Sequence, residues 1–183
     1  METLFNGFTL ALSPGAFPLS TDSMVLADFV RLRPNVGVLD LGSGCGTLGL
    51  LLCAKNESCT VTGIELDPEA HAMALENAAR NGIANAAFRE GDAGTLAQAL
   101  LKEGVHPRVI ILDPPRRGCD AATLSAVARL SPRRVVYISC DPATLARDVK
   151  ILSQAGYAVK KAQPVDLFPR TPHVECAAQL VRE

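Results

Sequence analysis

The segment Ser139-Cys140-Asp141-Pro142 places a cysteine between an apolar stretch and a predicted helix. Asp141 is a favourable N-cap and Pro142 a favourable first helical residue, so the helix would begin directly after the cysteine. Backbone N–H groups and the helix dipole at that end would lower the pKa of the thiol and make it a nucleophile. The same pattern also fits a small buried cysteine at the end of a strand, and both interpretations stay open here.

A glycine-rich turn supplies a second group of candidate residues. The run Asp40-Leu41-Gly42-Ser43-Gly44-Cys45-Gly46 follows a predicted strand and leads into a predicted helix from Thr47. Glycines allow a ligand to approach the backbone closely. Glu65 ends the next predicted strand about 20 residues further on, where a carboxylate accepts hydrogen bonds from ribose hydroxyls. A tight turn explains the glycines alone, but turn and acid together predict a nucleoside-containing cofactor.

Two cofactor classes fit this turn. The pattern GxGxxG is present in a shifted position from Gly44 to Gly49, so NAD and a dehydrogenase stay open. However, Asp40 before the turn and Asp92 after the third predicted strand add acceptors for an ammonium group and an adenine amino group. The combined set resembles the S-adenosylmethionine site of class I methyltransferases: Asp40, Gly42, Gly44, Thr47, Glu65 and Asp92.

Two further carboxylates follow or precede apolar strands. Asp113 ends a buried strand and is followed by Pro114, Pro115 and Arg116, which brings it to the same crevice as the glycine turn. Methyltransferases that act on amino groups of bases usually carry Asn-Pro-Pro-aromatic there, so this sequence argues against amine methylation. Glu175 precedes the last apolar stretch, where it is either a solvated edge residue or a general base.

Apolar runs, polar turns and helical stretches alternate from about residue 36, which is typical of a parallel sheet covered by helices. We expect one domain over 1–183, with residues 1–35 as a lead-in segment packed on a Rossmann-like core over 36–183. Helices are expected over 22–32, 47–54, 68–80 and 145–152. The expected strands are Gly37 to Leu41, Thr60 to Glu65, Ala86 to Arg89, Val109 to Asp113, Arg134 to Ser139, Tyr157 to Lys161 and Cys176 to Val181.

Bulk composition favours a soluble cytoplasmic protein. Its apolar runs are far shorter than the roughly 18 residues of a membrane span, and no basic-then-apolar leader opens the chain. The six cysteines lack CxxC or Cys/His ligand spacing, so we expect neither disulfides nor a metal.

Charge is unevenly distributed, with −6 over residues 1–100 and +5 over residues 101–183. The basic residues of the second part either contact a nucleic acid backbone or are ordinary solvated positions. They include Arg116-Arg117, Arg133-Arg134, Arg147, Lys150 and Lys160-Lys161.

Five segments together resemble the RNA 5-methyluridine (uracil-C5) methyltransferase family over about residues 36 to 183. They are DLGSGCG at 40–46, Glu65, DPPRRG at 113–118, SCDPATLARD at 139–148 and DLFPRTPHVE at 166–175. The resemblance implies an α/β fold of the class I S-adenosylmethionine-dependent type, with a seven-stranded, mostly parallel sheet and helices on both faces. It also implies that Cys140 is the nucleophile, that Glu175 is the general base, and that Gly42, Thr47, Glu65, Asp92 and Asp113 line the cofactor pocket.

The implied reaction is methylation of C5 of a uridine in tRNA or rRNA through a covalent adduct on Cys140. C5 of uracil is a weak nucleophile, and thiolate addition at C6 would activate it. The target base would have to leave its stack.

Two departures from the family pattern leave alternatives open. Family enzymes generally carry RNA-recognition segments before the catalytic domain, and a sequence of 183 residues has no room for them. We therefore expect a partner protein or a homodimer to recognise the RNA. The lead-in Phe17-Pro18-Leu19-Ser20-Thr21-Asp22-Ser23 differs from the family's Phe-x-Gln-x-Asn element and is more similar to the start of adenine N6-methyltransferases acting on tRNA. A base N-methyltransferase and a non-catalytic module that binds S-adenosylmethionine or RNA are therefore the alternatives.

Overall fold

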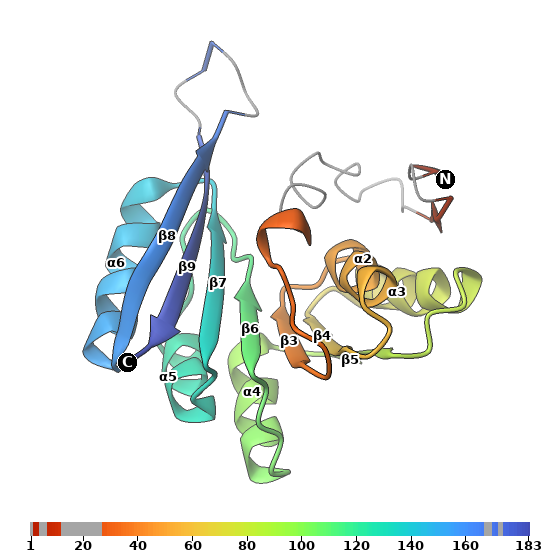
Figure 1. Cartoon of the computed structure of the whole chain (residues 1–183), viewed down its shortest axis with the longest axis horizontal. Helices are drawn as coiled ribbons and strands as arrows, with labels where there is room; N and C mark the ends of the chain where they lie inside the picture. Colours follow the sequence, from red (N-terminus) through yellow and green to blue (C-terminus); the bar gives the residue numbers. More distant parts are fainter. Residues whose placement is uncertain (1, 4–6, 12–26, 167–169, 172–173) are drawn as a thin grey trace. The chain divides into compact units, whose positions relative to one another are not determined.

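The computed structural model describes residues 2–3, 7–11, 27–166, 170–171 and 174–183. The chain divides into two compact units, Met1–Asp92 and Ala93–Glu183, and each is described by itself (Figure 1). The single-domain organisation with a lead-in remains a prediction. The first five residues of the predicted helix over 22–32 lie outside the described residues; of the rest, 27–29 are helical. The lead-in sequence at 17–23 also lies outside the described residues.

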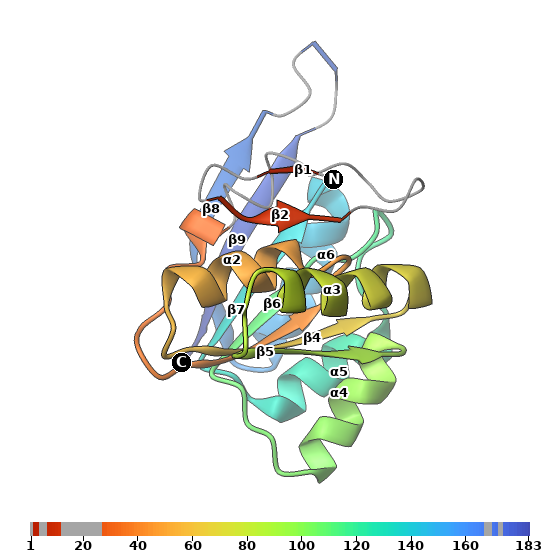
Figure 2. The ribbon, with the colours of Figure 1, turned by 90° about the vertical axis from the view of Figure 1, so that its right-hand side faces the viewer.

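The first unit contains a parallel sheet with the strand order β5-β4-β3. Its strands are β3 (Gly37–Leu41), β4 (Thr60–Glu65) and β5 (Ala86–Glu90). Helices α2 (Thr47–Lys55) and α3 (Pro68–Arg80) lie on the same side of these strands (Figure 2). Two short strands, β1 (Glu2–Thr3) and β2 (Thr9–Leu10), form a separate antiparallel pair.

Helix α3 begins and ends at the predicted residues because local signals define both ends. The carboxylate of Asp67 accepts a hydrogen bond from the N–H of Glu69 at 2.8 Å, and Pro68 takes the first helical position. Gly82 follows the helix with a φ of 65°, a left-handed conformation that glycine adopts easily. These caps fix the direction in which the chain leaves β4 and returns to β5.

Two asparagines of α3 hold the described part of the lead-in. The Asn81 Oδ1 accepts a hydrogen bond from the N–H of Thr9 at 3.0 Å, and the Asn77 Oδ1 accepts one from Ala11 at 2.7 Å. The Nδ2 of Asn77 also donates to the carbonyl of Cys45 at 3.1 Å. Asn77 is fully buried, so this one amide ties residue 11 and the glycine turn to the same helix.

The second unit contains strands in the order β6-β7-β9-β8. Strands β6 (Val109–Leu112) and β7 (Arg134–Ser139) are parallel, whereas β9 (Glu175–Arg182) runs antiparallel to both β7 and β8 (Tyr157–Val165). The helices are α4 (Ala93–Lys102), α5 (Ala121–Leu130) and α6 (Pro142–Gln154), and α6 packs alongside β7 and β8 (Figure 1). With three strands in the first unit and four in the second, the seven predicted strands are all present.

Strand β8 is longer than predicted because it continues through Pro164 to Val165. Proline lacks an N–H donor and is tolerated where a strand has a neighbour on one side only. Here β9 is the only neighbour that β8 has in its sheet among the described residues, and it pairs with β8 along its length. Among the helices that the structure describes, none is long and apolar enough to cross a membrane.

Candidate functional site

The nine predicted site residues fall into two groups, one in each unit. The first unit carries the predicted cofactor residues Asp40, Gly42, Gly44, Thr47, Glu65 and Asp92. The second unit carries Asp113 and the predicted catalytic pair, Cys140 and Glu175. Each group is described within its own unit.

The glycine turn lies against the end of β4. The N–H groups of Gly42 and Ser43 both donate to the carbonyl of Ile64, at 2.9 and 3.0 Å. Gly42, Gly44 and Gly46 have φ values of 87°, 54° and 82°, and such left-handed backbone favours glycine. No heavy atom lies within 4 Å of where a Cβ of Gly44 would stand, so the backbone there is open to a ligand.

The carboxylate of Glu65 is held beside this open backbone. Its Oε2 accepts a hydrogen bond from the N–H of Gly44 at 2.7 Å, and its Oε1 accepts one from Asp67 at 2.9 Å. A carboxylate oxygen has room for a second hydrogen bond, so both oxygens remain able to accept from ribose hydroxyls. The predicted turn and the predicted acid are therefore in direct contact.

The glycines that complete GxGxxG have a packing role. A Cβ on Gly46 would stand 2.8 Å from the ring of Phe88, and one on Gly49 would stand 3.0 Å from Val61. A side chain on Gly46 would clash with Phe88, and one on Gly49 would make an unusually tight contact with Val61, so both glycines allow close packing. Close packing therefore explains the GxGxxG spacing without a bound dinucleotide.

The remaining predicted cofactor residues differ in exposure. Asp40 is 1% exposed and Thr47 is buried, with its Oγ1 3.2 Å from the Sγ of Cys45. Asp92 is exposed directly after β5. An open glycine backbone, a held carboxylate and two further carboxylates at strand ends fit an adenosyl group with an attached amino acid.

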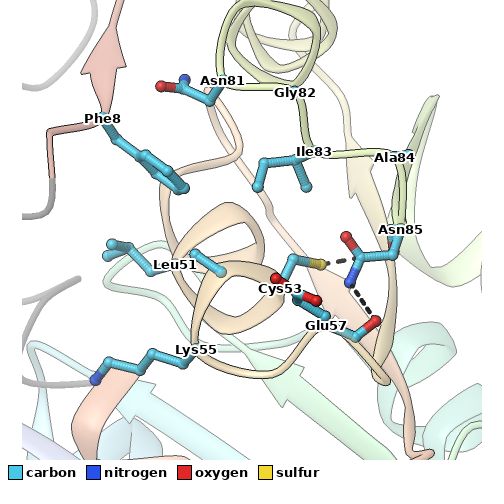
Figure 3. A pocket seen from close by; sticks show the side chains of 11 residues that line it. Phe8, Leu51, Cys53, Lys55, Glu57, Asn81, Gly82, Ile83, Ala84 and Asn85 are labelled. Atoms are coloured by element: carbon cyan, nitrogen blue, oxygen red, sulfur yellow. Dashed lines mark hydrogen bonds between the residues drawn. The ribbon is translucent and has the colours of Figure 1, made fainter.

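A cavity of about 750 Å³ in the first unit contains none of the predicted site residues (Figure 3). Phe8, Leu51 and Ile83 line its apolar part, and Cys53 donates to the carbonyl of Asn85 across its inner wall at 3.5 Å. Burial raises the pKa of Cys53 to about 12, so this thiol is protonated at neutral pH. Its charged lining residues are Lys55 and Glu57, and neither belongs to the predicted cofactor or catalytic set.

Strand pairing brings the predicted catalytic residues together. Strands β7 and β9 are antiparallel, and Ser139 pairs with Cys176 at this end of the ladder. Cys140 follows Ser139, and Glu175 precedes Cys176, so both residues adjoin the last pair of this ladder, and the charge of Glu175 acts on the thiol of Cys140. The predicted nucleophile and base, which are distant in sequence, are neighbours in the fold.

The half-buried Cys140 does not have the lowered pKa that the sequence predicts; its pKa is raised. Burial is the largest cause, and the negative charge of Glu175 adds to it. Arg116 acts in the opposite direction, and the carboxylate of Asp113 raises the pKa again. The loop after β6 therefore brings one favourable and one unfavourable charge to the thiol.

The helix α6 fails to lower this pKa for a local reason. Its first free N–H groups, those of Ala143 and Thr144, donate to the carboxylate of Asp141 at 2.8 and 3.2 Å. The N-cap therefore takes up the donors that the sequence-based prediction assigned to Cys140.

One buried carboxylate was missed by the sequence argument. Asp148 of α6 is 0% exposed and binds Tyr137 and Arg147, so Arg147 is an internal partner here and not a free basic residue. The sequence does carry a signal, because Asp148 lies on the apolar stripe formed by Leu145 and Leu152. A charged residue at such a position needs a buried partner.

Comparisons with known proteins agree with the predicted family. A family model described as tRNA (Uracil-5-)-methyltransferase matches residues 29–183. An RNA methyltransferase of Bacillus cereus, itself uncharacterized, is 45% identical over 153 residues, or 84% of this chain and 33% of the relative. One from Clostridium acetobutylicum is 41% identical and covers 100% of this chain and 40% of the relative. The chain thus spans about a third to two fifths of the length of these relatives.

Solved structures agree on the fold. The tRNA (uracil-54, C5)-methyltransferase of Pyrococcus abyssi, in complex with S-adenosyl-L-homocysteine, is 30% identical with a TM-score of 0.78, covering 94% of this chain and 42% of that one. NSun6 from Pyrococcus horikoshii, at 18% identity and a TM-score of 0.74, covers 91% of this chain and 53% of that one and shows likeness of fold alone. The chain has the Rossmann-like α/β fold of class I S-adenosylmethionine-dependent methyltransferases, and it belongs to the tRNA (uracil-5-)-methyltransferase family.

Proposed function

We propose that this chain takes part in methylating C5 of a uridine in RNA, with Cys140 as nucleophile and Glu175 as general base. The observation that supports this most strongly is the pairing of β7 with β9, whose last pair, Ser139 with Cys176, adjoins both residues. The family match and the RNA methyltransferase relatives support the RNA substrate.

In this reaction the Cys140 thiol first gives up its proton to solvent, and the resulting thiolate attacks C6 of the uracil ring. A C6–S bond forms, and the electrons of the C5–C6 double bond move toward O4 as an enolate, which makes C5 nucleophilic. After C5 has gained the methyl group, the Glu175 carboxylate accepts the proton from C5. The electrons of that C–H bond restore the double bond, and the C6–S bond breaks to release the thiolate.

S-adenosylmethionine supplies the methyl group when bound. Glu65 would accept hydrogen bonds from the ribose, and the open backbone at Gly44 would lie against the ligand. Asp40 and Asp92 would accept hydrogen bonds from its amino groups, with Gly42 and Thr47 completing the turn. The family resemblance alone assigns Asp113 to the same role. These residues would bind and orient the cofactor, whereas Cys140 would perform the covalent step and Glu175 the proton transfer.

The test uses the protein with S-adenosylmethionine and RNA that contains 5-fluorouridine. Fluorine at C5 cannot leave as a proton, so the adduct on Cys140 would accumulate and appear in denaturing mass spectrometry. A Cys140→Ser variant that still binds S-adenosylmethionine should form no adduct and no 5-methyluridine. Methylation that persists in Cys140→Ser would overturn the proposal and favour N-methylation of a base. Cofactor binding without methylation or adduct in the wild type would favour a non-catalytic module or one that needs a partner.

A further inference from the structure

The side chain of Asp148 is buried in the second unit, and the proposed reaction does not use it directly. Its Oδ2 accepts hydrogen bonds from the hydroxyl of Tyr137 and from the N–H of Cys119, the latter at 2.8 Å. Its Oδ1 accepts one from the Nε of Arg147 at 2.7 Å. Both oxygens are thus engaged with donors from β7, from α6 itself and from the loop that follows β6.

Side chains of α6 also hold the main chain of that loop. One terminal nitrogen of Arg147 donates to the carbonyls of Arg117 and Cys119, at 3.0 and 3.2 Å. The hydroxyl of Thr144 donates to the carbonyl of Arg116 at 3.2 Å. The loop therefore contacts α6 through the carbonyls of Arg116, Arg117 and Cys119 as well as through Asp148.

Gly118 shows how closely the loop and the helix approach. Its φ is 78°, and a Cβ there would stand 2.5 Å from a terminal nitrogen of Arg147 and 2.7 Å from the Oδ2 of Asp148. The backbone of the loop thus lies directly on the buried Asp148 and the half-exposed Arg147, with no space for a side chain. Any shift of Asp148 or Arg147 must move the loop.

The loop also carries groups that act on the proposed nucleophile. Asp113 and Arg116 lie in it, and the charges of both reach the thiol of Cys140. The Nε of Arg116 is 3.9 Å from a carboxylate oxygen of Asp141, the cap of α6. Helix α6 begins at Pro142, two residues after Cys140. The helix that holds the loop therefore also follows the thiol closely in the chain.

We propose that Asp148 is a positioning residue: together with Tyr137 and Arg147 it clamps the 113–119 loop onto α6 and so fixes Asp113 and Arg116 beside Cys140. The inference rests on the proposed role of Cys140. A purely stabilising network is the simpler alternative, because buried charged pairs often serve stability alone or can be replaced by apolar side chains. The two differ in whether loosening the network changes the chemistry of Cys140.

The test measures how fast iodoacetamide alkylates Cys140 at a series of pH values, by peptide mass spectrometry on the full chain. Tyr137→Phe removes one hydrogen bond to Asp148, and Asp148→Asn removes the charge. Tyr157→Phe is the matched control, because Tyr157 is also buried in this unit and its hydroxyl donates to the carbonyl of Pro132 at 2.9 Å. Thermal denaturation of each variant reports the loss of stability alone.

Tyr137→Phe and Tyr157→Phe should lower the melting temperature by similar amounts, but only Tyr137→Phe should change Cys140. Of the two loop charges, Arg116 has the larger effect on the thiol and lowers its pKa, so a loosened loop raises that pKa further. We expect alkylation of Cys140 about threefold slower at a fixed pH below the pKa, which corresponds to less thiolate. Asp148→Asn should have a larger effect in the same direction.

Equal Cys140 profiles in Tyr137→Phe and Tyr157→Phe would overturn the positioning role. That pair decides the question even if Asp148→Asn does not fold. Alkylation needs neither RNA nor methyl transfer, so it also separates this inference from the proposed function. If Cys140→Ser still methylates RNA, the proposed function fails, whereas the clamp is still decided by the alkylation profiles.

Discussion

The thiol of Cys140 shares its surroundings with the carboxylates of Glu175 and Asp113 and the guanidinium of Arg116. Burial and Glu175 raise the pKa of Cys140 above its ordinary value, so the resting thiol is protonated at neutral pH. A protonated resting cysteine is protected from adventitious oxidation, because thiolate character governs that reaction. Deprotonation then becomes part of the reaction itself.

The raised pKa predicts a strong pH dependence of Cys140 reactivity. Below the pKa, the thiolate fraction rises about tenfold for each pH unit, so alkylation by iodoacetamide should keep rising from pH 7 to pH 9. Peptide mass spectrometry would follow Cys140 separately from the other five cysteines. A rate that levels off near pH 7 would contradict the raised pKa.

Replacement of Glu175 by glutamine should change the thiol and the turnover in opposite directions. Loss of the negative charge lowers the pKa of Cys140, so its alkylation curve moves to lower pH. Loss of the base leaves the C5 proton in place, so turnover should fall by about 100-fold or more and the covalent adduct should accumulate.

Glu183→Gln is the matched control for that change, because Glu183 follows the other end of β9 and pairs with Lys160 on the surface. It should leave both the alkylation curve and turnover unchanged. Glu175→Gln with wild-type turnover would remove Glu175 from the proposed mechanism.

At the scale of elements, the turn between β3 and α2 combines glycines with different tasks. Gly46 and Gly49 allow close packing against Phe88 and Val61, whereas the backbone at Gly44 is open and bonded to Glu65. The sequence pattern treats these glycines alike. Only the neighbouring β4 and β5 distinguish packing positions from a ligand-facing one.

Gly44→Ala should therefore reduce S-adenosylmethionine affinity at least tenfold, because a methyl group would occupy backbone surface that the ligand needs. Gly82→Ala is a suitable control, since Gly82 has a similar φ of 65° and an equally open surrounding. Both variants should lose about 1–2 kcal/mol of stability from left-handed strain. Calorimetric titration and thermal denaturation would separate the two effects, and equal affinities would exclude Gly44 from the cofactor site.

At the scale of the whole molecule, positive charge is concentrated late in the chain, with +5 over residues 101–183 against −6 over residues 1–100. Some of these basic side chains form ion pairs with carboxylates of the same chain, such as Arg147 with the buried Asp148 and Lys160 with the exposed Glu183. Arg117 is exposed in the loop that α6 clamps, so it is a better candidate for contact with an RNA phosphate.

Arg117→Glu should weaken RNA binding roughly 3- to 10-fold and reduce the salt dependence of binding by about one ion. Arg129→Glu makes the same charge change at an exposed position in the last turn of α5 and should have little effect. Filter binding of labelled RNA at several salt concentrations would compare them. Equal losses in both variants would indicate a general charge effect and no contact at Arg117.

The sequence by itself determined the strands, the caps of α3 and the family, because alternation, capping residues and linear motifs are local properties. It also predicted Cys140 and Glu175 as catalytic residues through their motifs. Only the tertiary structure decided that antiparallel pairing of β7 with β9 makes them neighbours, and that Asp141 takes the helix N–H groups expected to activate the thiol. It alone revealed the Asp148 clamp. These features depend on strand register, burial and charges from distant segments, which local sequence patterns do not encode.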